Sequence, residues 1–85
     1  MEVTRVAMNP WDFTLYRSTN GDLILKVIFS EGEYKTDIGR YFLINSLNVD
    51  VNNIEQLKSL AARIREDYPA VPHQQIDKSD VIIVK

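Results

Sequence analysis

One strand-length segment, residues 22–29, is apolar on both of its faces, and the rest of the chain can be arranged around it. In an extended conformation one face would carry Leu23, Leu25, Val27 and Phe29, and the other Ile24 and Ile28. A strand with apolar residues on both faces is normally covered on both sides or placed centrally in its sheet. We therefore predict a central strand here.

The residues before this segment predict two more strands. Residues 2–8 alternate weakly, which indicates an edge strand, and Asn9-Pro10 ends it because proline has no amide proton to donate. Residues 11–17 alternate cleanly, with Trp11, Phe13 and Leu15 toward the core, and Asp12, Thr14 and Tyr16 toward water or a partner. Asn20-Gly21 then predicts a hairpin with a type I′ turn, because both central positions of that turn need positive φ.

A second turn at residues 30–32 leads into residues 33–45, which we predict as the fourth strand. Gly39 lies inside this segment, and an isolated glycine in a strand indicates a bulge or bend. A short helix over residues 38–47 is the alternative, because a short apolar run fits either period.

From residue 53 to residue 68 the apolar spacing changes to that of an amphipathic helix. The apolar positions are Ile54, Leu57, Leu60, Ala61, Ile64 and Tyr68. Asn52 or Asn53 can cap the start, and Pro69 ends the helix. We expect this helix to pack across the sheet.

Residues 69–80 read as an extended connector, and residues 81–84 form a final strand that is apolar on both faces. Such a strand should lie inside the sheet, and its direction stays open. The predicted fold is α+β in the order β-β-β-β-α-β: an antiparallel meander of about four strands, one amphipathic helix packed on the sheet, and a C-terminal strand. We expect residues 1–85 to form one compact domain. Its predicted core is Phe13, Leu15, Leu25, Val27, Leu57, Leu60 and Ile64.

Length and composition narrow the function classes. A chain of 85 residues leaves little room for an enclosed catalytic pocket. Cysteine is absent, so neither disulfides nor thiolate metal sites can form. The formal net charge is −2, and no window has the length and apolarity of a signal peptide or a membrane span. We expect a cytoplasmic protein without membrane contact.

The sequence offers few candidates for catalysis. His73 is the single histidine, and with Asp77 and Asp80 it could supply metal ligands, or with Ser79 and Asp77 a nucleophilic set for a small hydrolase. A loop histidine beside glutamines is more typical of a solvated side chain, and the three glycines are too isolated to form a phosphate loop. We therefore expect no enzyme activity, metal, cofactor or small-molecule substrate.

Aromatic and basic residues adjoin one another at several strand positions, and we predict that they form a partner-binding face. The candidates are Tyr16, Arg17, Tyr34, Arg40 and Tyr41. These residue types are enriched in protein interfaces, so we expect binding to another protein or to a second copy as a homodimer. Single-stranded nucleic acid is the alternative, but it needs a cationic groove, and acidic residues are interleaved here. Nucleic acid is therefore disfavoured.

Overall fold

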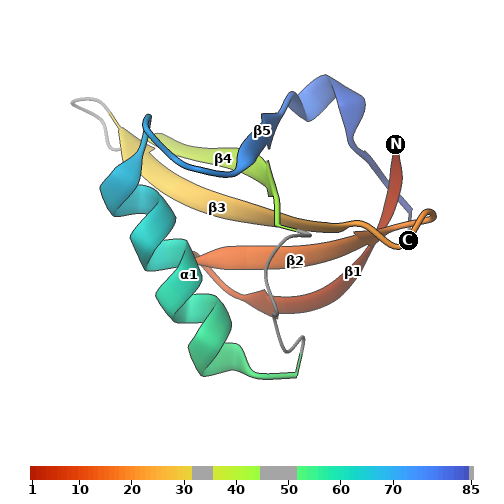
Figure 1. Ribbon diagram of the computed structural model, residues 1–85, viewed down its shortest axis with the longest axis horizontal. Coiled ribbons are helices and arrows are strands. Elements are labelled where there is room, and N and C mark those ends of the chain that lie inside the picture. Colours follow the sequence, from red (N-terminus) through yellow and green to blue (C-terminus); the bar gives the residue numbers. More distant parts are fainter. Residues whose placement is uncertain (32–35, 45–51, 85) are drawn as a thin grey trace.

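The meander predicted from the N-terminal half is present in the computed structural model, which describes residues 1–31, 36–44 and 52–84 (Figure 1). Its strands are β1 (Glu2–Asn9), β2 (Phe13–Ser18), β3 (Leu23–Glu31) and β4 (Thr36–Leu43), each antiparallel to the next. The helix α1 (Ile54–Asp67) follows, and then β5 (Gln74–Ile76), the 3-10 turn η1 (Lys78–Asp80) and β6 (Ile82–Ile83). The sheet order is β5-β4-β3-β2-β1-β6. The predicted α+β fold and its element order are thus confirmed, with β5 as an additional strand inside the segment expected to be a connector.

The hairpin between β2 and β3 forms as predicted, but its turn is of another type. The N–H of Gly21 donates to the carbonyl of Ser18 over 3.0 Å, and Gly21 has a φ of 87°. Asn20 is not among the residues with positive φ, so the type I′ prediction is wrong. The three-residue loop is instead a type I turn closed by a left-handed glycine. The Ser18 hydroxyl oxygen supports it by accepting from the N–H groups of Asn20 and Asp22.

Gly39 makes room for a side chain and does not form a bulge. The register of β3 with β4 runs without a shift through the pair Ile28 and Gly39. A Cβ at position 39 would overlap Cε of Lys26, whose side chain crosses the glycine. The bulge predicted at Gly39 is therefore wrong, and a bulge occurs in β1 at Val6. Residues 38–43 are strand and not helix, while residues 45–47 lie outside the described residues.

The helix covers one face of the sheet. Its cap is Asn53, whose Oδ1 accepts from the N–H of Gln56 over 3.1 Å. The inward positions Leu57, Ala61 and Ile64 are buried against apolar side chains of the strands. The sheet contributes Phe13, Leu15, Leu25, Val27, Phe29 and Phe42 to this main core. Six of the seven predicted core residues are buried, and Leu60 is half-buried at the margin.

The opposite face is covered by the chain that follows α1. Val3, Tyr16, Ile24 and Tyr41 form a second buried cluster, against which Ile76 and Val81 pack. Figure 1 shows α1 on one side of the sheet and the chain from β5 onward on the other. This segment joins the two sheet edges, because β5 pairs with β4 and β6 pairs with β1.

The final strand lies at the edge of the sheet and not in its interior. β6 runs parallel to β1, and the N–H groups of Ile82 and Val84 donate to the carbonyls of Met1 and Val3. Ile82 and Ile83 are 56% and 46% exposed. The expectation of an interior strand is therefore wrong. We expected β6 to be covered on both faces because both are apolar, but its side chains remain exposed at the edge of the sheet.

The main core generates a stability prediction. Leu57 is fully buried, so Leu57→Ala should lower the free energy of unfolding by about 2–5 kcal/mol. Leu60→Ala should cost less, because the half-buried Leu60 leaves a site that water can fill. Denaturant unfolding of both variants measures the difference. An equal or larger loss at Leu60 would contradict the observed orientation of α1.

Candidate functional site

The structure buries the two best-placed members of the predicted partner-binding face. Tyr16 and Tyr41 are 6% and 4% exposed, with ring centroids 6.3 Å apart, beneath the C-terminal segment. Sequence alternation placed Tyr16 on the less apolar face, and we expected that face to meet water or a partner. The expectation is wrong because Ile76 and Val81 cover it. Neither ring offers a stacking platform on the surface.

The basic members of the predicted face are also separated. Arg17 is exposed on β2. Arg40 lies on the helix-covered side of the sheet, where its guanidinium carbon is 4.8 Å from the ring centroid of Phe29 and 4.6 Å from that of Tyr68. Such stacking is a cation–π interaction within the fold. Tyr34 lies outside the described residues. The structure therefore brings Tyr16 and Tyr41 together but places Arg40 on the other face.

The polar residues considered for catalysis or metal binding have local structural roles. The Asp77 carboxylate accepts from the N–H and the hydroxyl of Ser79, which caps η1. These hydrogen bonds lower the pKa of Asp77 below its ordinary range. His73 lies apart from this pair, in a hollow against Arg63 and Asp67 of α1. Within the described residues, no group of three or more His, Cys, Asp or Glu side chains is arranged to hold a metal ion.

Exposed apolar side chains gather along one edge of the sheet. The large hydrophobic residues exposed in the described part of the chain are Met1, Val6, Met8, Trp11, Ile54, Ile82, Ile83 and Val84. All except Ile54 belong to β1, its immediate flanks or the C-terminal strand beside it. Single exposed hydrophobic residues are ordinary, but a concentration of them on one side marks a candidate interaction surface. We call these residues other than Ile54 the apolar edge.

Much of the β1 edge also lacks a neighbouring strand. β6 pairs with Glu2 and Val3, and over the remainder of β1 the described chain places no strand on the side away from β2. Unpaired strand edges are templates for pairing with another chain. The opposite edge differs in character, because β5 exposes Gln74 and Gln75. The two ends of one sheet are thus polar at β5 and apolar at β1 and β6.

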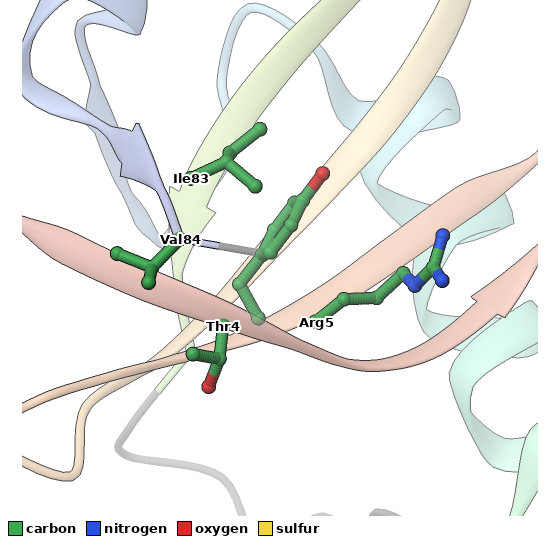
Figure 2. A pocket seen from close by; sticks show the side chains of 5 residues that line it. Thr4, Arg5, Ile83 and Val84 are labelled. Carbon is green, nitrogen blue, oxygen red and sulfur yellow. The ribbon is translucent and has the colours of Figure 1, made fainter.

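A hollow of about 520 Å³ opens where β6 stops beside β1. Its lining residues are Thr4, Arg5, Tyr16, Ile83 and Val84. Figure 2 shows Ile83 and Val84 on one side of the hollow and the guanidinium of Arg5 on the other. The lining combines aliphatic walls, one phenol and one cation, which suits a flat apolar or aromatic group.

Trp11 lies beyond the other end of β1 in an unusual conformation. The N–H of Asp12 donates to the carbonyl of Asn9 over 3.1 Å, and Trp11 has a φ of 66°. With Pro10 before it, this geometry is that of a type II turn, whose third position favours glycine. The Trp11 side chain is 85% exposed. Sequence alternation had placed it in the core, and that is wrong because Asn9-Pro10 starts a turn that extends through Trp11.

Arg65 of α1 fixes this turn to the body of the protein. Its Nε donates to the carbonyl of Ile28 over 2.7 Å, and its Nη2 donates to the carbonyl of Asp12 over 2.6 Å. Nη2 also forms an ion pair with the Asp12 carboxylate, which accepts from Nδ2 of Asn9 over 3.0 Å as well. The turn is therefore held at both ends. It presents an exposed indole on a fixed support.

Sequence reasoning missed Trp11, Met8, Ile83 and Val84 as surface residues. For Trp11 a signal was present, because an Asn-Pro pair followed two residues later by Asp is typical of a turn. For Ile83 and Val84 no local signal exists, since an exposed apolar edge strand and a buried one have the same composition.

The geometry of the turn generates a prediction about Trp11. Glycine adopts positive φ freely, and a left-handed non-glycine residue costs about 1–2 kcal/mol. Trp11→Gly should therefore leave the free energy of unfolding unchanged or raise it by up to about 1 kcal/mol, after the entropy of glycine in the unfolded chain is deducted. Denaturant unfolding measures this change. A loss of more than about 1 kcal/mol would mean that the indole contributes to packing, and Trp11→Ala serves as the comparison that retains the backbone strain.

The buried tyrosines generate a prediction about pH. Burial is the main cause that raises the pKa of Tyr16 and of Tyr41 above the ordinary value of 10.0. The unfolded chain therefore loses these protons first, so their contribution is fully present below about pH 10 and is lost as pH rises through the raised folded values. Unfolding free energies measured across this alkaline range should fall more steeply for the natural chain than for the Tyr16→Phe, Tyr41→Phe double variant. Equal slopes would contradict the burial of these hydroxyl groups.

Comparison with known proteins yields no match to a family model, to a curated protein or to a solved structure.

Proposed function

We propose that this domain is a non-enzymatic protein-binding module and that its binding surface is the apolar edge. The observation that supports the proposal is the concentration of exposed hydrophobic side chains along β1 and β6, together with the open strand edge of β1. Water-exposed apolar area is unfavourable, and a partner that covers it gains about 25 cal/mol for each Å² removed from water. Strand pairing would add directional hydrogen bonds to that gain.

Trp11 strengthens the proposal because its placement is unfavourable for the isolated chain. An indole that is 85% exposed contributes little packing, and its left-handed backbone is strained. Tryptophan is also enriched among the residues that dominate binding energies. A residue that costs stability while it offers a rigid aromatic contact suits a role in binding.

Single-stranded nucleic acid is supported less well. Binding of that kind uses exposed aromatic rings in a cationic groove, whereas Tyr16 and Tyr41 are buried and the formal net charge is −2. Apart from the indole of Trp11, the apolar edge carries aliphatic and methionine side chains, which suit a protein surface better than a phosphate backbone.

Site-specific photo-crosslinking in the native cells tests the proposal. A photoreactive amino acid at Met8 should form a covalent adduct with a protein, since Met8 is 47% exposed on the open part of β1. The control places the same amino acid at Gln75, which is exposed on β5 at the opposite edge of the sheet. Binding at the apolar edge requires an adduct at position 8 and none, or far less, at position 75.

Competition separates specific capture from chance collision. Excess natural chain should suppress the adduct at position 8, and excess Trp11→Gly chain should suppress it poorly. If position 8 yields no protein adduct, or if both competitors act equally, the apolar edge is not the binding surface.

A further inference from the structure

We infer that the partner at the apolar edge is a second copy of this chain, joined through antiparallel pairing of β1 with β1, so that Trp11 of each copy enters the hollow of the other. This inference rests on the proposed function and names its partner. Three features of the edge carry it: the places of the indole and the hollow, the pattern of charge along β1, and the lining of the hollow.

The indole and the hollow lie at opposite ends of the same strand. Trp11 comes two residues after the end of β1, while Thr4 and Arg5 in the first half of β1 line the hollow with Ile83 and Val84. A two-fold interface requires that when one residue contacts another, the reciprocal contact also forms. Antiparallel pairing of two β1 strands sets the end of each strand beside the start of the other. It therefore brings each indole toward the opposite hollow, and both contacts form together.

The open part of β1 is compatible with pairing to itself. In a register centred on Ala7, Val6 of one copy faces Met8 of the other, so two exposed hydrophobic side chains meet. Arg5 then faces Asn9, and Arg5 is the one charged residue between Thr4 and Asn9, so no like charges face each other. The bulge at Val6 increases the local twist of β1, and the same bulge is present in the β1 strand of the second copy, so the two paired strands twist alike.

Both ends of this pairing have defined limits. At the start of β1, β6 already occupies the edge beside Glu2 and Val3. At the end of β1, Pro10 and Trp11 turn the chain back into β2. The available edge is therefore the segment between the β6 pairing and the turn. In the register centred on Ala7, Trp11 of one copy comes opposite Val3 of the other, where Ile83 is paired.

The lining of the hollow suits an indole. Aliphatic side chains of Ile83 and Val84 form one wall, and the guanidinium of Arg5 lies across from them (Figure 2). A guanidinium over an indole face gives a cation–π interaction, and tryptophan is the best aromatic acceptor for it. The volume of about 520 Å³ falls within the range of small-ligand pockets, roughly 300–1,000 Å³, and so admits a large aromatic group.

Trp11 itself provides the measurement, since it is the single tryptophan of the chain. Sedimentation velocity from about 1 µM to about 1 mM covers moderate to weak affinities, and the mass should rise from monomer to dimer. Over the same range the tryptophan emission should shift to shorter wavelength, because the indole leaves water for the hollow. The two curves should have the same midpoint.

Matched variants test whether Trp11 of one copy contacts the hollow of the other. Ile83→Lys places a charge at the hollow and should weaken dimerisation about tenfold or more. Gln75→Lys places the same charge at an exposed residue of β5, at the opposite edge of the sheet, and should leave both curves unchanged. Trp11→Gly should remain folded by circular dichroism and be monomeric across the range.

A chain that stays monomeric up to about 1 mM overturns the inference, and so does a dimer whose tryptophan emission does not change or that survives Ile83→Lys. The proposed function is tested separately by crosslinking at Met8. A monomer that still forms a specific adduct with a different protein there refutes the second copy as partner and leaves the apolar edge as a binding surface. The absence of any adduct refutes both.

Discussion

The burial of both faces of β2 and β3 is the constraint on which the remaining structure depends. Phe13, Leu15, Leu25 and Val27 require a cover on one side, and Tyr16 and Ile24 require one on the other. In the described part of the chain, α1 covers one of these faces. The other cover must come from irregular chain, which explains why the segment after α1 crosses from the β4 edge to the β1 edge. On this path Ile76, at the end of β5, and Val81, between η1 and β6, supply the apolar contacts that cover the second face.

The strained turn at Trp11 depends on the same architecture. A left-handed residue without a glycine persists only where surrounding contacts determine its geometry. Here α1 supplies them, because Arg65 reaches the backbone of both Ile28 and Asp12 and pairs with the Asp12 carboxylate. Hydrogen bonds to charged groups contribute about 1.5–3 kcal/mol each, which is of the order of the backbone strain of about 1–2 kcal/mol. The packing of α1 on the sheet therefore also fixes the orientation of the exposed indole.

The sequence predicted what depends on local periodicity and missed what depends on distant chain. The hairpin at Asn20-Gly21, the helix start at Asn53 and the order of elements follow from neighbouring residues, and they are confirmed. The burial of Tyr16 and Tyr41 could not be predicted, because the residues that cover them follow more than thirty positions later, Ile76 in an apparently polar connector and Val81 at the start of the predicted final strand. The prediction of a bulge at Gly39 failed for a similar reason, because the Lys26 side chain that lies over Gly39 belongs to another strand. The residues of the predicted partner-binding face were chosen because aromatic and basic residues adjoin in the sequence, but the fold places Arg40 on the opposite face of the sheet from Tyr16 and Tyr41.

The two ends of the sheet explain why association at β1 would stop at two copies. Very short edge strands offer little for further pairing, and β5 has 3 residues and exposes Gln74 and Gln75, whereas β6 exposes Ile82 and Ile83. Two copies joined at their β1 edges would form one continuous sheet, and each outer end of that sheet would be a β5 strand. The apolar ends would both lie at the centre, while polar residues would face water at either side. The difference between the two edges of the sheet thus favours a closed dimer over an open fibre. Both β1 edges are buried once the dimer has formed, so no β1 edge remains for a third copy.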